Sequence, residues 1–278
     1  MPELPEVETV VRRIRPTLEG RTVEGVEVHD ARWALPLSPA ELERQLTGRH
    51  VEGVSRRGKY ILVALDSGKT LVMHLRMTGT ILINPDEEIG HERAEFGLSD
   101  GTRLVFNDPR RFGTAELITT TSLDDYFSGR LGLEPFDAGF TGVHFFGLTR
   151  GRKAPLKSFL LDQKLIAGIG NIYADEALFR ARLHPLRQPY GLTRDQAESL
   201  RLGAIDALQA GIDAGGATID DFRNPDGAWG AYQSEFLVHR REGKDCPACG
   251  TSIIKFKVGG RATYCCEACQ KRPSRIRR

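Results

Sequence analysis

The first six residues of the chain, M-P-E-L-P-E, hold groups that can do covalent chemistry. Removal of Met1 would leave Pro2 at the amino terminus as a secondary amine, a group whose reference pKa is about 7.7 to 8.0. Such an amine attacks an electrophilic carbon and forms an iminium, as lysine does in Schiff-base enzymes. Glu3 lies beside it and can move the proton that the reaction needs. A simpler interpretation is that Pro2, Glu3, Pro5 and Glu6 only begin a helix, and a retained Met1 would block the amine.

Four cysteines in the last part of the chain have the spacing of a zinc site. Cys246 and Cys249 form one C-x2-C pair, Cys266 and Cys269 form a second, and sixteen residues separate the pairs. Four thiolates complete a tetrahedral Zn²⁺ site and leave no position for water, so the predicted metal is structural. A ligand set that uses Cys265 in place of Cys266 stays open. Disulfide bonds are the alternative, and they are rare in an intracellular protein.

The residues between the cysteine pairs predict a basic β-hairpin. The stretch I-I-K-F-K-V-G-G-R-A-T-Y alternates in polarity and turns at Gly259 and Gly260, which would present Lys255, Lys257 and Arg261. Residues 236–278 hold eleven Lys and Arg against three acidic residues, a net charge of +8 that leaves −6 for the rest of a chain whose total is +2. This asymmetry indicates a polyanionic partner, with a solvated basic tail as the alternative.

Length and composition exclude several classes of protein. A chain of 278 residues and 30.8 kDa is long enough for about two domains. With 40% hydrophobic residues, 27% charged residues and 14 prolines it is neither disordered nor collagen-like. No apolar run approaches the roughly 20 residues that span a bilayer. The acidic first segment is unlike a secretory signal, so we expect an intracellular, cytoplasmic protein.

The hydrophobic pattern predicts an α+β protein whose elements change along the chain. Residues 3–18 have the spacing of an amphipathic helix, and short apolar runs broken by turns over residues 21–133 predict a β-sandwich or barrel. Helical patterns follow, and Thr193 with Gln196 forms a capping-box signature. The expected parts are the amino-terminal helix and β-sandwich (1–134), a linker (135–154), a helical domain (155–235), and the zinc hairpin with its basic tail (236–278).

Several segments occur in an order that resembles one known family. They are M-P-E-L-P-E-V-E-T-V, R-R-G-K-Y, H-L-R-M-T-G, N-D-P-R-R-F-G, L-L-D-Q-K-L-I-A-G-I-G-N-I-Y-A-D-E-A-L-F and the two C-x2-C pairs. From Pro2 to Gln270 the chain is similar to the formamidopyrimidine-DNA glycosylases. The related endonuclease VIII branch usually begins P-E-G-P-E, so Leu4 favours the formamidopyrimidine branch. The resemblance implies a helix-two-turn-helix domain that ends in a zinc β-hairpin with four cysteine ligands.

The resemblance also implies an activity. In this family the amino-terminal proline attacks C1′ of a damaged nucleotide, the base leaves, and the iminium permits β and δ elimination of both phosphates. We therefore expect a bifunctional DNA glycosylase and abasic-site lyase of base excision repair that removes 8-oxoguanine and formamidopyrimidines from duplex DNA. It would be a monomer with one structural Zn²⁺ as its cofactor. The catalytic residues it implies are Pro2 as nucleophile, Glu3 as acid and base, Glu6 as a second acid, and Lys59 as a phosphate ligand.

The expected chemistry requires the damaged base to leave the stack, because a duplex hides C1′. The resemblance assigns the space left behind to Met77, Arg110 and Phe112, and a thioether, a donor fork and an aromatic wedge suit that task. Further DNA contacts are implied for His74, Lys157, Asn171 and Arg261. Gly168 and Gly170 would let the backbone approach a phosphate at a helix start. Affinity held by phosphate contacts should fall steeply with salt.

Some positions depart from the family pattern. The segment G-G-A-T-I-D-D-F-R-N-P-D-G-A-W-G-A-Y-Q resembles the lesion-sensing loop, but Asp220 stands where a basic residue is common and Trp229 is bulky. The usual V-Y-G-R reads V-H-R-R at 238–241, and a basic tail continues over 271–278. These departures leave open a preference for oxidised pyrimidines, as in the endonuclease VIII relatives. A noncatalytic scaffold that holds damaged DNA is the other alternative, and Pro2, Glu3 and Glu6 argue against it.

Overall fold

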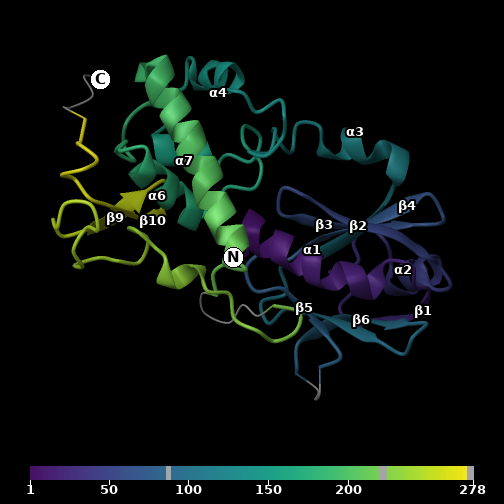
Figure 1. Ribbon diagram of the computed structural model, residues 1–278. Coiled ribbons are helices and arrows are strands. Elements are labelled where there is room, and N and C mark those ends of the chain that lie inside the picture. Colours follow the sequence, from purple (N-terminus) through teal and green to yellow (C-terminus); the bar gives the residue numbers. More distant parts are fainter. Residues whose placement is uncertain (86–88, 219–223, 274–278) are drawn as a thin grey trace. The chain divides into compact units, whose positions relative to one another are not determined.

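The computed structural model describes residues 1–85, 89–218 and 224–273, which belong to two compact units (Figure 1). The first unit comprises Met1–Ser128 with Ala214–Ala231, and the second comprises Gly129–Asp213 with Tyr232–Arg278. The expected boundary at residue 134 lies close to the observed one. The expectation that residues 155–235 form one domain is corrected, because the segment 214–231 belongs to the first unit.

The first unit is the expected β-sandwich. Its described strands form two four-stranded antiparallel sheets with the orders β1-β6-β7-β5 and β2-β3-β4-β8. The strands are β1 (Val23–Val28), β2 (Val51–Arg57), β3 (Tyr60–Leu65), β4 (Lys69–His74), β5 (Thr80–Ile83), β6 (Glu92–Leu98), β7 (Arg103–Asn107) and β8 (Thr114–Thr119). The sequence pattern had indicated six of them. It missed β2, whose apolar residues are separated by Glu52 and Gly53, and β6, in which charged and small residues alternate with Ala94 and Phe96.

Helix α1 (Leu4–Leu18) supplies one side of the sandwich core. Its apolar residues at helical spacing, Val7, Val10, Val11 and Ile14, are fully buried in the cluster that also holds side chains of both sheets. Helix α2 (Pro39–Leu46) packs against β1, and α3 (Leu123–Phe127) follows β8. Helix α1 is the element expected over residues 3–18, and its first turn carries the acidic groups of the amino terminus.

The second unit is helical with a small β-hairpin. Helices α5 (Leu156–Leu161), α6 (Asn171–Arg180) and α7 (Arg194–Asp213) follow the predicted pattern, and α4 (Gly142–Thr149) packs against α7. The Thr193 hydroxyl accepts from the Gln196 amide (3.2 Å) and the Gln196 side chain accepts from the Thr193 amide (3.2 Å), which confirms the predicted capping box. The segment expected to be a linker, residues 135–154, contains helix α4. The buried Phe145 of this helix packs it into the second unit.

Strands β9 (Ile254–Val258) and β10 (Arg261–Cys265) form the predicted hairpin. Gly259 and Gly260 have φ of +55° and +76°, the backbone conformation that a tight hairpin turn requires and that glycine adopts without strain. Short 3-10 helices lie at Thr120–Ser122, Pro189–Gly191 and Tyr232–Ser234. Within the described residues, no helix has the length and apolar character to cross a membrane.

Candidate functional site

The start of α1 brings two buried carboxylates together behind Pro2. Glu3 is the residue before the helix, and its side chain accepts from the Glu6 amide, while the Glu3 amide donates to Glu6 Oε2 at 2.8 Å. This reciprocal pair satisfies two amides that a helix start leaves without partners. The predicted helix start and the predicted reactive residues are therefore one arrangement: Pro2, Glu3 and Glu6 are all buried, and Met1 is 43% exposed.

The second oxygen of Glu6 holds a distant segment. Ala217 donates its amide to Glu6 Oε1 at 2.8 Å, so both Glu6 oxygens accept backbone hydrogen bonds. Gly216 has φ of +80°, and a Cβ there would lie 3.1 Å from Glu6 Cγ. The same segment bonds elsewhere in the unit, because Ile83 donates to the Pro225 carbonyl (2.9 Å) and Arg13 forms an ion pair with Asp226. Glu6 thus joins the first turn of α1 to the segment 214–231.

Lys59 lies at the turn between β2 and β3 and is buried. A chain of contacts connects that turn to α1. The Arg56 guanidinium contacts Glu8 of α1 (Nε to Oε2, 3.0 Å) and also donates to the Gly58 carbonyl at 2.8 Å. Hydrogen bonds from Arg12 and Arg56 outweigh partial burial and lower the pKa of Glu8. The turn that carries Lys59 is therefore anchored to α1 at Glu8, two residues after Glu6.

His74 ends β4 opposite Tyr60, with the two rings edge to face at 4.5 Å. Its Nδ1 accepts from the Arg76 amide at 2.9 Å. Burial, with the positive charges of Arg76 and Lys59, lowers the pKa of His74 to about 3, so the ring is neutral at physiological pH. His74 therefore holds the backbone that leads to Met77, and its expected role as a phosphate ligand stays a prediction.

The three residues expected to fill the duplex are exposed on two neighbouring loops. Phe112 is 51% exposed and Met77 39%, large fractions for apolar side chains. The Arg110 guanidinium lies over the Phe112 ring, 5.1 Å from its centroid. The Thr78 hydroxyl bonds to the Asp108 carboxylate, which connects the loop of Met77 to the loop of Arg110 and Phe112. The structure thus brings these residues together as a group that solvent reaches.

Sequence reasoning missed Asp108. Its side chain is fully buried and accepts from the amides of Arg110 (3.2 Å), Phe112 (2.8 Å) and Gly113 (2.7 Å). An aspartate that begins a turn and accepts from the following amides is a known signature, and D-P-R-R-F-G carries it. The signal was present in the sequence, whereas the hydrogen bond from Thr78 depends on the fold.

In the second unit, one side chain organises the turn between α5 and α6. Gln163 accepts from the Gly168 amide (2.9 Å) and donates to the carbonyls of Ile169 (2.8 Å) and Leu161 (3.1 Å). Gly168 has φ of +94°, which explains a glycine there. Asn171 is the first residue of α6 and donates to the Ala262 carbonyl of β10 at 3.1 Å. The turn and the hairpin are therefore connected beside Arg261, which is exposed.

Lys157, which the resemblance assigns to DNA binding, is buried in the structure, and its expected DNA contact stays a prediction. Its side chain is fully buried, and Nζ lies 2.7 Å from Asp175 Oδ1 and 2.6 Å from the Ala262 carbonyl oxygen. Lys157 and Asn171 hold the same carbonyl, the one that follows Arg261, so Lys157 supports the hairpin from within.

Two neighbouring acids on α6 hold the segment before the cysteines. Asp175 Oδ2 lies 2.9 Å from His239 Nδ1, and Glu176 accepts from the amides of Leu237, Val238 and His239 at 3.0 to 3.1 Å. Both carboxylates are fully buried. The histidine of the unusual V-H-R-R segment therefore has a buried acidic partner.

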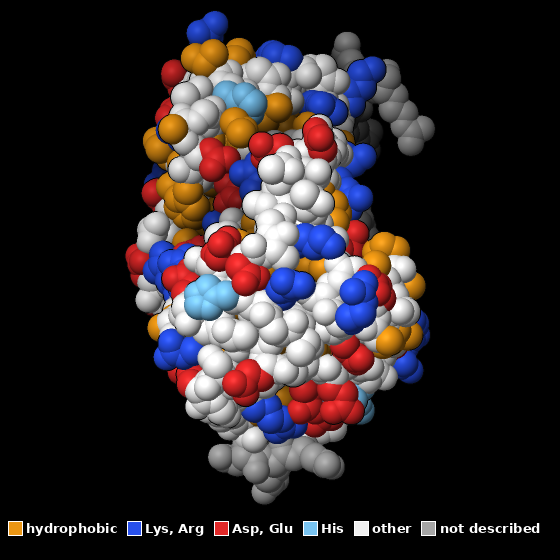
Figure 2. Space-filling view, turned by 90° about the vertical axis from the view of Figure 1, so that its right-hand side faces the viewer, with side chains coloured by type: hydrophobic (Ala, Val, Ile, Leu, Met, Phe, Trp, Pro, Cys, Tyr) orange, Lys and Arg blue, Asp and Glu red, His pale blue; other side chains and the backbone are white. Residues whose placement is uncertain are grey.

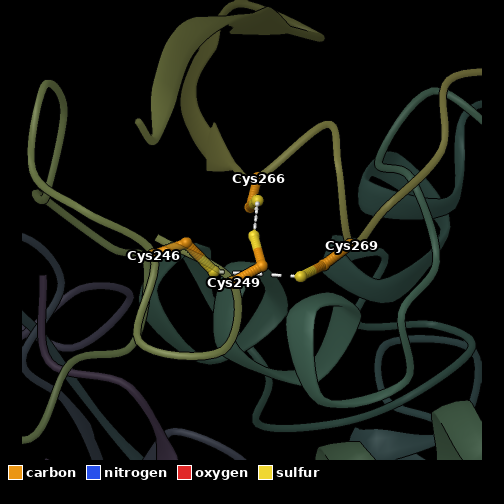
Figure 3. Close-up of side chains that lie close together, drawn as sticks. All are labelled: Cys246, Cys249, Cys266 and Cys269. Atoms are coloured by element: carbon orange, nitrogen blue, oxygen red, sulfur yellow. Dashed lines mark hydrogen bonds between the residues drawn. The ribbon is translucent and has the colours of Figure 1, made fainter. Parts of the chain in front are cut away.

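The four cysteines of the two C-x2-C pairs converge on one point (Figure 3). Their sulfur atoms all lie within 4.8 Å of one another, with 3.4 Å between Cys249 and Cys266 and 3.9 Å between Cys246 and Cys269. Tetrahedral zinc with Zn–S bonds of about 2.3 Å separates its sulfurs by roughly 3.8 Å, so the donors fit. Cys265 lies outside the cluster, fully buried, with Sγ 3.9 Å from His184 Nε2, and burial raises the pKa of its thiol to about 12. The alternative ligand set with Cys265 is wrong.

Other surfaces and departures complete the description. On the face in Figure 2, basic and acidic side chains alternate across the described residues, a mixture typical of a solvated surface. Trp229 is 61% exposed. Asp220 and residues 274–278 of the basic tail lie outside the described residues, so the expectations about them stay predictions.

Comparison with known proteins gives this arrangement a family. The models of the formamidopyrimidine-DNA glycosylase N-terminal domain and H2TH domain match residues 1–115 and 131–223. The chain therefore belongs to the formamidopyrimidine-DNA glycosylase family.

Relatives named formamidopyrimidine-DNA glycosylase include one from Gluconobacter oxydans, 42% identical over 98% of this chain and 100% of its own length, and one from Pelotomaculum thermopropionicum, 43% identical over 98% and 99%. Among solved structures, the MutM (Fpg) protein of Thermus thermophilus is 42% identical, covers 98% of this chain and 100% of its own, and has a TM-score of 0.87. The Lactococcus lactis Fpg in complex with DNA that contains an abasic site is 35% identical with the same coverage and a TM-score of 0.91.

Proposed function

We propose that this protein is a bifunctional DNA glycosylase and abasic-site lyase that removes oxidised purines from duplex DNA, with Pro2 as its nucleophile. The observation that carries the proposal is the start of α1, where Pro2 is buried beside two carboxylates that bond each other's amides. A capping box accounts for the hydrogen bonds of these two acids, but it does not require that both be buried, and burying carboxylates is costly. A mutant of the Lactococcus lactis relative has been solved with DNA that contains Fapy-dG, and the relative itself with DNA that contains an abasic site, which supports both activities.

The reaction begins when removal of Met1 frees the Pro2 amine. The nitrogen attacks C1′ and loses its proton, the bond from C1′ to the base breaks, and the electron pair leaves with the base, which takes up a proton. The bond from C1′ to the ring oxygen then breaks, the oxygen takes up a proton as the sugar opens, and the nitrogen lone pair forms the C=N bond of the iminium. The resulting iminium acidifies the neighbouring carbon of the sugar, so loss of a proton expels the 3′ phosphate, and a second elimination expels the 5′ phosphate. Glu3 is the residue beside the amine that can give and take these protons.

Glu6 would act differently from Glu3. Both of its oxygens accept backbone amides, from Glu3 and from Ala217. A carboxylate whose two oxygens both accept backbone amides is held in one orientation. We therefore assign Glu6 to positioning the Pro2 end of α1 against the segment 214–231, and Lys59, anchored through Arg56 and Glu8, to binding a phosphate near the reacting sugar.

The exposed group of Met77, Arg110 and Phe112 would replace the damaged nucleotide in the stack. Flipping costs a few kcal/mol of stacking and pairing, and inserted apolar side chains recover part of that cost. Arg110 would donate to the unpaired opposite base. In the second unit, Asn171 and Arg261 would hold phosphates, with Lys157 as a buried support.

Zinc would bind at Cys246, Cys249, Cys266 and Cys269. It would supply a structural cross-link between the two ends of the hairpin and, with four protein ligands, no open coordination position. Its loss should loosen the hairpin that carries Arg261.

A preference for oxidised pyrimidines is the second candidate. The Lactococcus lactis relative has also been solved with DNA that contains an oxidised pyrimidine, and the exposed Trp229 lies in the segment 214–231 that docks on Glu6. An enzyme with these substrates would work in the cytoplasm at the nucleoid, where a reducing environment also keeps the cysteines available as metal ligands.

Mass spectrometry after borohydride reduction tests the proposal. The protein is mixed with duplex that carries 8-oxoguanine opposite cytosine, and separately with duplex that carries an abasic site. We expect loss of Met1 and a DNA adduct on Pro2 with both duplexes, and no adduct when Met1 is retained. An adduct with abasic DNA alone would keep the lyase and shift the substrate to other lesions. No adduct with either duplex would refute the amine mechanism and favour a noncatalytic scaffold.

A further inference from the structure

The loop that carries Arg110 and Phe112 contains an unusual backbone conformation. Arg111, between them, has φ of +60°, and Arg76, which precedes Met77, has φ of +54°. These are left-handed conformations that residues other than glycine rarely adopt and that persist only where the surroundings enforce them. Strained residues therefore lie next to all three of the exposed side chains assigned to the duplex.

An ion pair with a buried carboxylate holds the Arg111 side chain in place. Its Nε lies 2.7 Å from Oδ2 of Asp30, a residue 81 positions earlier in the chain. Asp30 is buried, with 4% of its side chain exposed, and follows β1. The hydrogen bond from Arg111 outweighs burial and holds the pKa of Asp30 well below its usual range, so the carboxylate is ionised. The Arg32 amide also donates to Oδ1 at 3.1 Å, which fixes the orientation of the carboxylate.

A second carboxylate holds the same loop from the other side. Asp108 accepts from the amides of Arg110, Phe112 and Gly113 and from the Thr78 hydroxyl. It binds every amide from 110 to 113 except that of Arg111, whose own amide donates to the Asp108 carbonyl at 3.2 Å. Asp108 therefore binds the backbone of this loop, whereas Asp30 binds the Arg111 side chain.

We propose that Asp30 is a positioning residue for duplex opening: its ion pair with Arg111 locks the loop so that Arg110 and Phe112 stand outward as a preformed wedge. This inference rests on the proposed action on duplex DNA. An exposed aromatic side chain tends to fold back onto the protein surface, so it must be held outward. If the side chain is already ordered before the protein meets DNA, its insertion into the duplex costs less conformational entropy. Asp30 would not touch DNA or the reacting atoms.

The chain offers a matched control. Arg32 contacts the same carboxylate through its side chain (Nε to Oδ1, 3.4 Å) and is 58% exposed. It has no described contact with the loop that carries Arg110 and Phe112, here called the wedge loop. Arg32→Gln removes an arginine from Asp30 and leaves Arg111 in place. Arg111→Gln removes the other partner of the ion pair. Because Arg111 is exposed, this variant tests the same ion pair without changing a buried residue.

Stopped-flow fluorescence of 2-aminopurine placed beside a lesion tests the proposal in the full-length protein. We expect Asp30→Asn and Arg111→Gln to slow base opening and duplex excision by about three- to tenfold, the effect of losing a charged hydrogen bond that solvent partly screens. Arg32→Gln should match wild type. Lyase activity on a single-stranded abasic oligonucleotide, where no base must be flipped, should be unchanged in all three. The double variant should be no slower than the slower single variant.

The outcomes separate the two levels of inference. If wild type opens the duplex and Asp30→Asn and Arg111→Gln open it equally fast, the proposed lock is overturned. Equal losses on duplex and single-stranded substrates would reduce Asp30 to a general structural role, which also overturns it. If wild type itself produces no fluorescence change and no excision on any lesion duplex, the proposed function fails, and the lock proposed for duplex opening is overturned with it.

Discussion

Removing the buried Lys157 should destabilise the second unit strongly and leave the first unit unchanged. Lys157→Met keeps an unbranched side chain, one atom shorter, and removes its charge. It also removes two contacts, at 2.7 Å to Asp175 and 2.6 Å to the Ala262 carbonyl, both inside the unit. Breaking one side of a buried ion pair costs about 3 to 5 kcal/mol, because the remaining charge stays desolvated. With a urea dependence of about 2 kcal/mol per molar, the unfolding midpoint should fall by roughly 2 M.

The positions of the tryptophans make this measurement selective. Trp33 and Trp229, the only two in the sequence, belong to the first unit, and Trp33 is buried between Phe96 and Phe106. Tryptophan fluorescence therefore reports on the first unit, whereas circular dichroism at 222 nm includes the helices of the second. The dichroism midpoint should fall and the fluorescence midpoint should stay.

Two further variants decide whether the buried charge is the cause. Lys153→Met, at an exposed position in the same segment, should change neither midpoint. Adding Asp175→Asn to Lys157→Met removes the unpaired carboxylate and should restore part of the loss. A fall of less than about 0.5 M in the dichroism midpoint, or an equal fall for Lys153→Met, would refute the reasoning.

Three other predictions concern single positions. Gly216→Ala should cost the first unit about 1 to 2 kcal/mol by tryptophan fluorescence, because φ is +80° and a Cβ would lie 3.1 Å from a buried glutamate; Gly215→Ala, with φ of +71° and nothing within 4 Å, should cost less. Wild type should lose stability as pH falls from about 6.5 toward 3, because the unfolded chain protonates His74 while the folded pKa is about 3. His74→Asn keeps an acceptor for the amide and should recover about 2 kcal/mol of the stability that wild type loses between pH 7 and 5, measured by urea titration. If the unfolding free energies of the two proteins change equally with pH, the prediction is contradicted. Cys266→Ala should abolish bound zinc measured by elemental analysis, whereas Cys265→Ala should retain one ion per chain, and the reverse result would reassign the ligands.

Features set by neighbours in the chain were predictable from the sequence. The spacing of apolar residues located α1, the two C-x2-C pairs located the sulfur cluster, and Thr193 with Gln196 located the start of α7. Each of these depends on residues a few positions apart or on a ligand geometry with few solutions. The family resemblance supplied the remaining site residues.

What the sequence did not predict depends on distant partners. Lys157 looked like a basic residue available to DNA, but Asp175 and Ala262, 18 and 105 positions away, enclose it. Segment 214–231 follows a helix of the second unit, yet contacts with Glu6 and Arg13 dock it in the first. Nothing local to these residues records such contacts, so composition and spacing could not predict them.

The discontinuous first unit has a consequence for synthesis. On the ribosome, residues 1–128 emerge long before residues 214–231, so the sandwich can form while Glu6 Oε1 still lacks the Ala217 amide. The acidic end of α1 becomes complete only when most of the second unit has also been made. A nascent chain would therefore carry the residues of a DNA-cleaving centre in an unfinished arrangement, and finishing that centre is tied to making the helices and turn assigned to holding DNA.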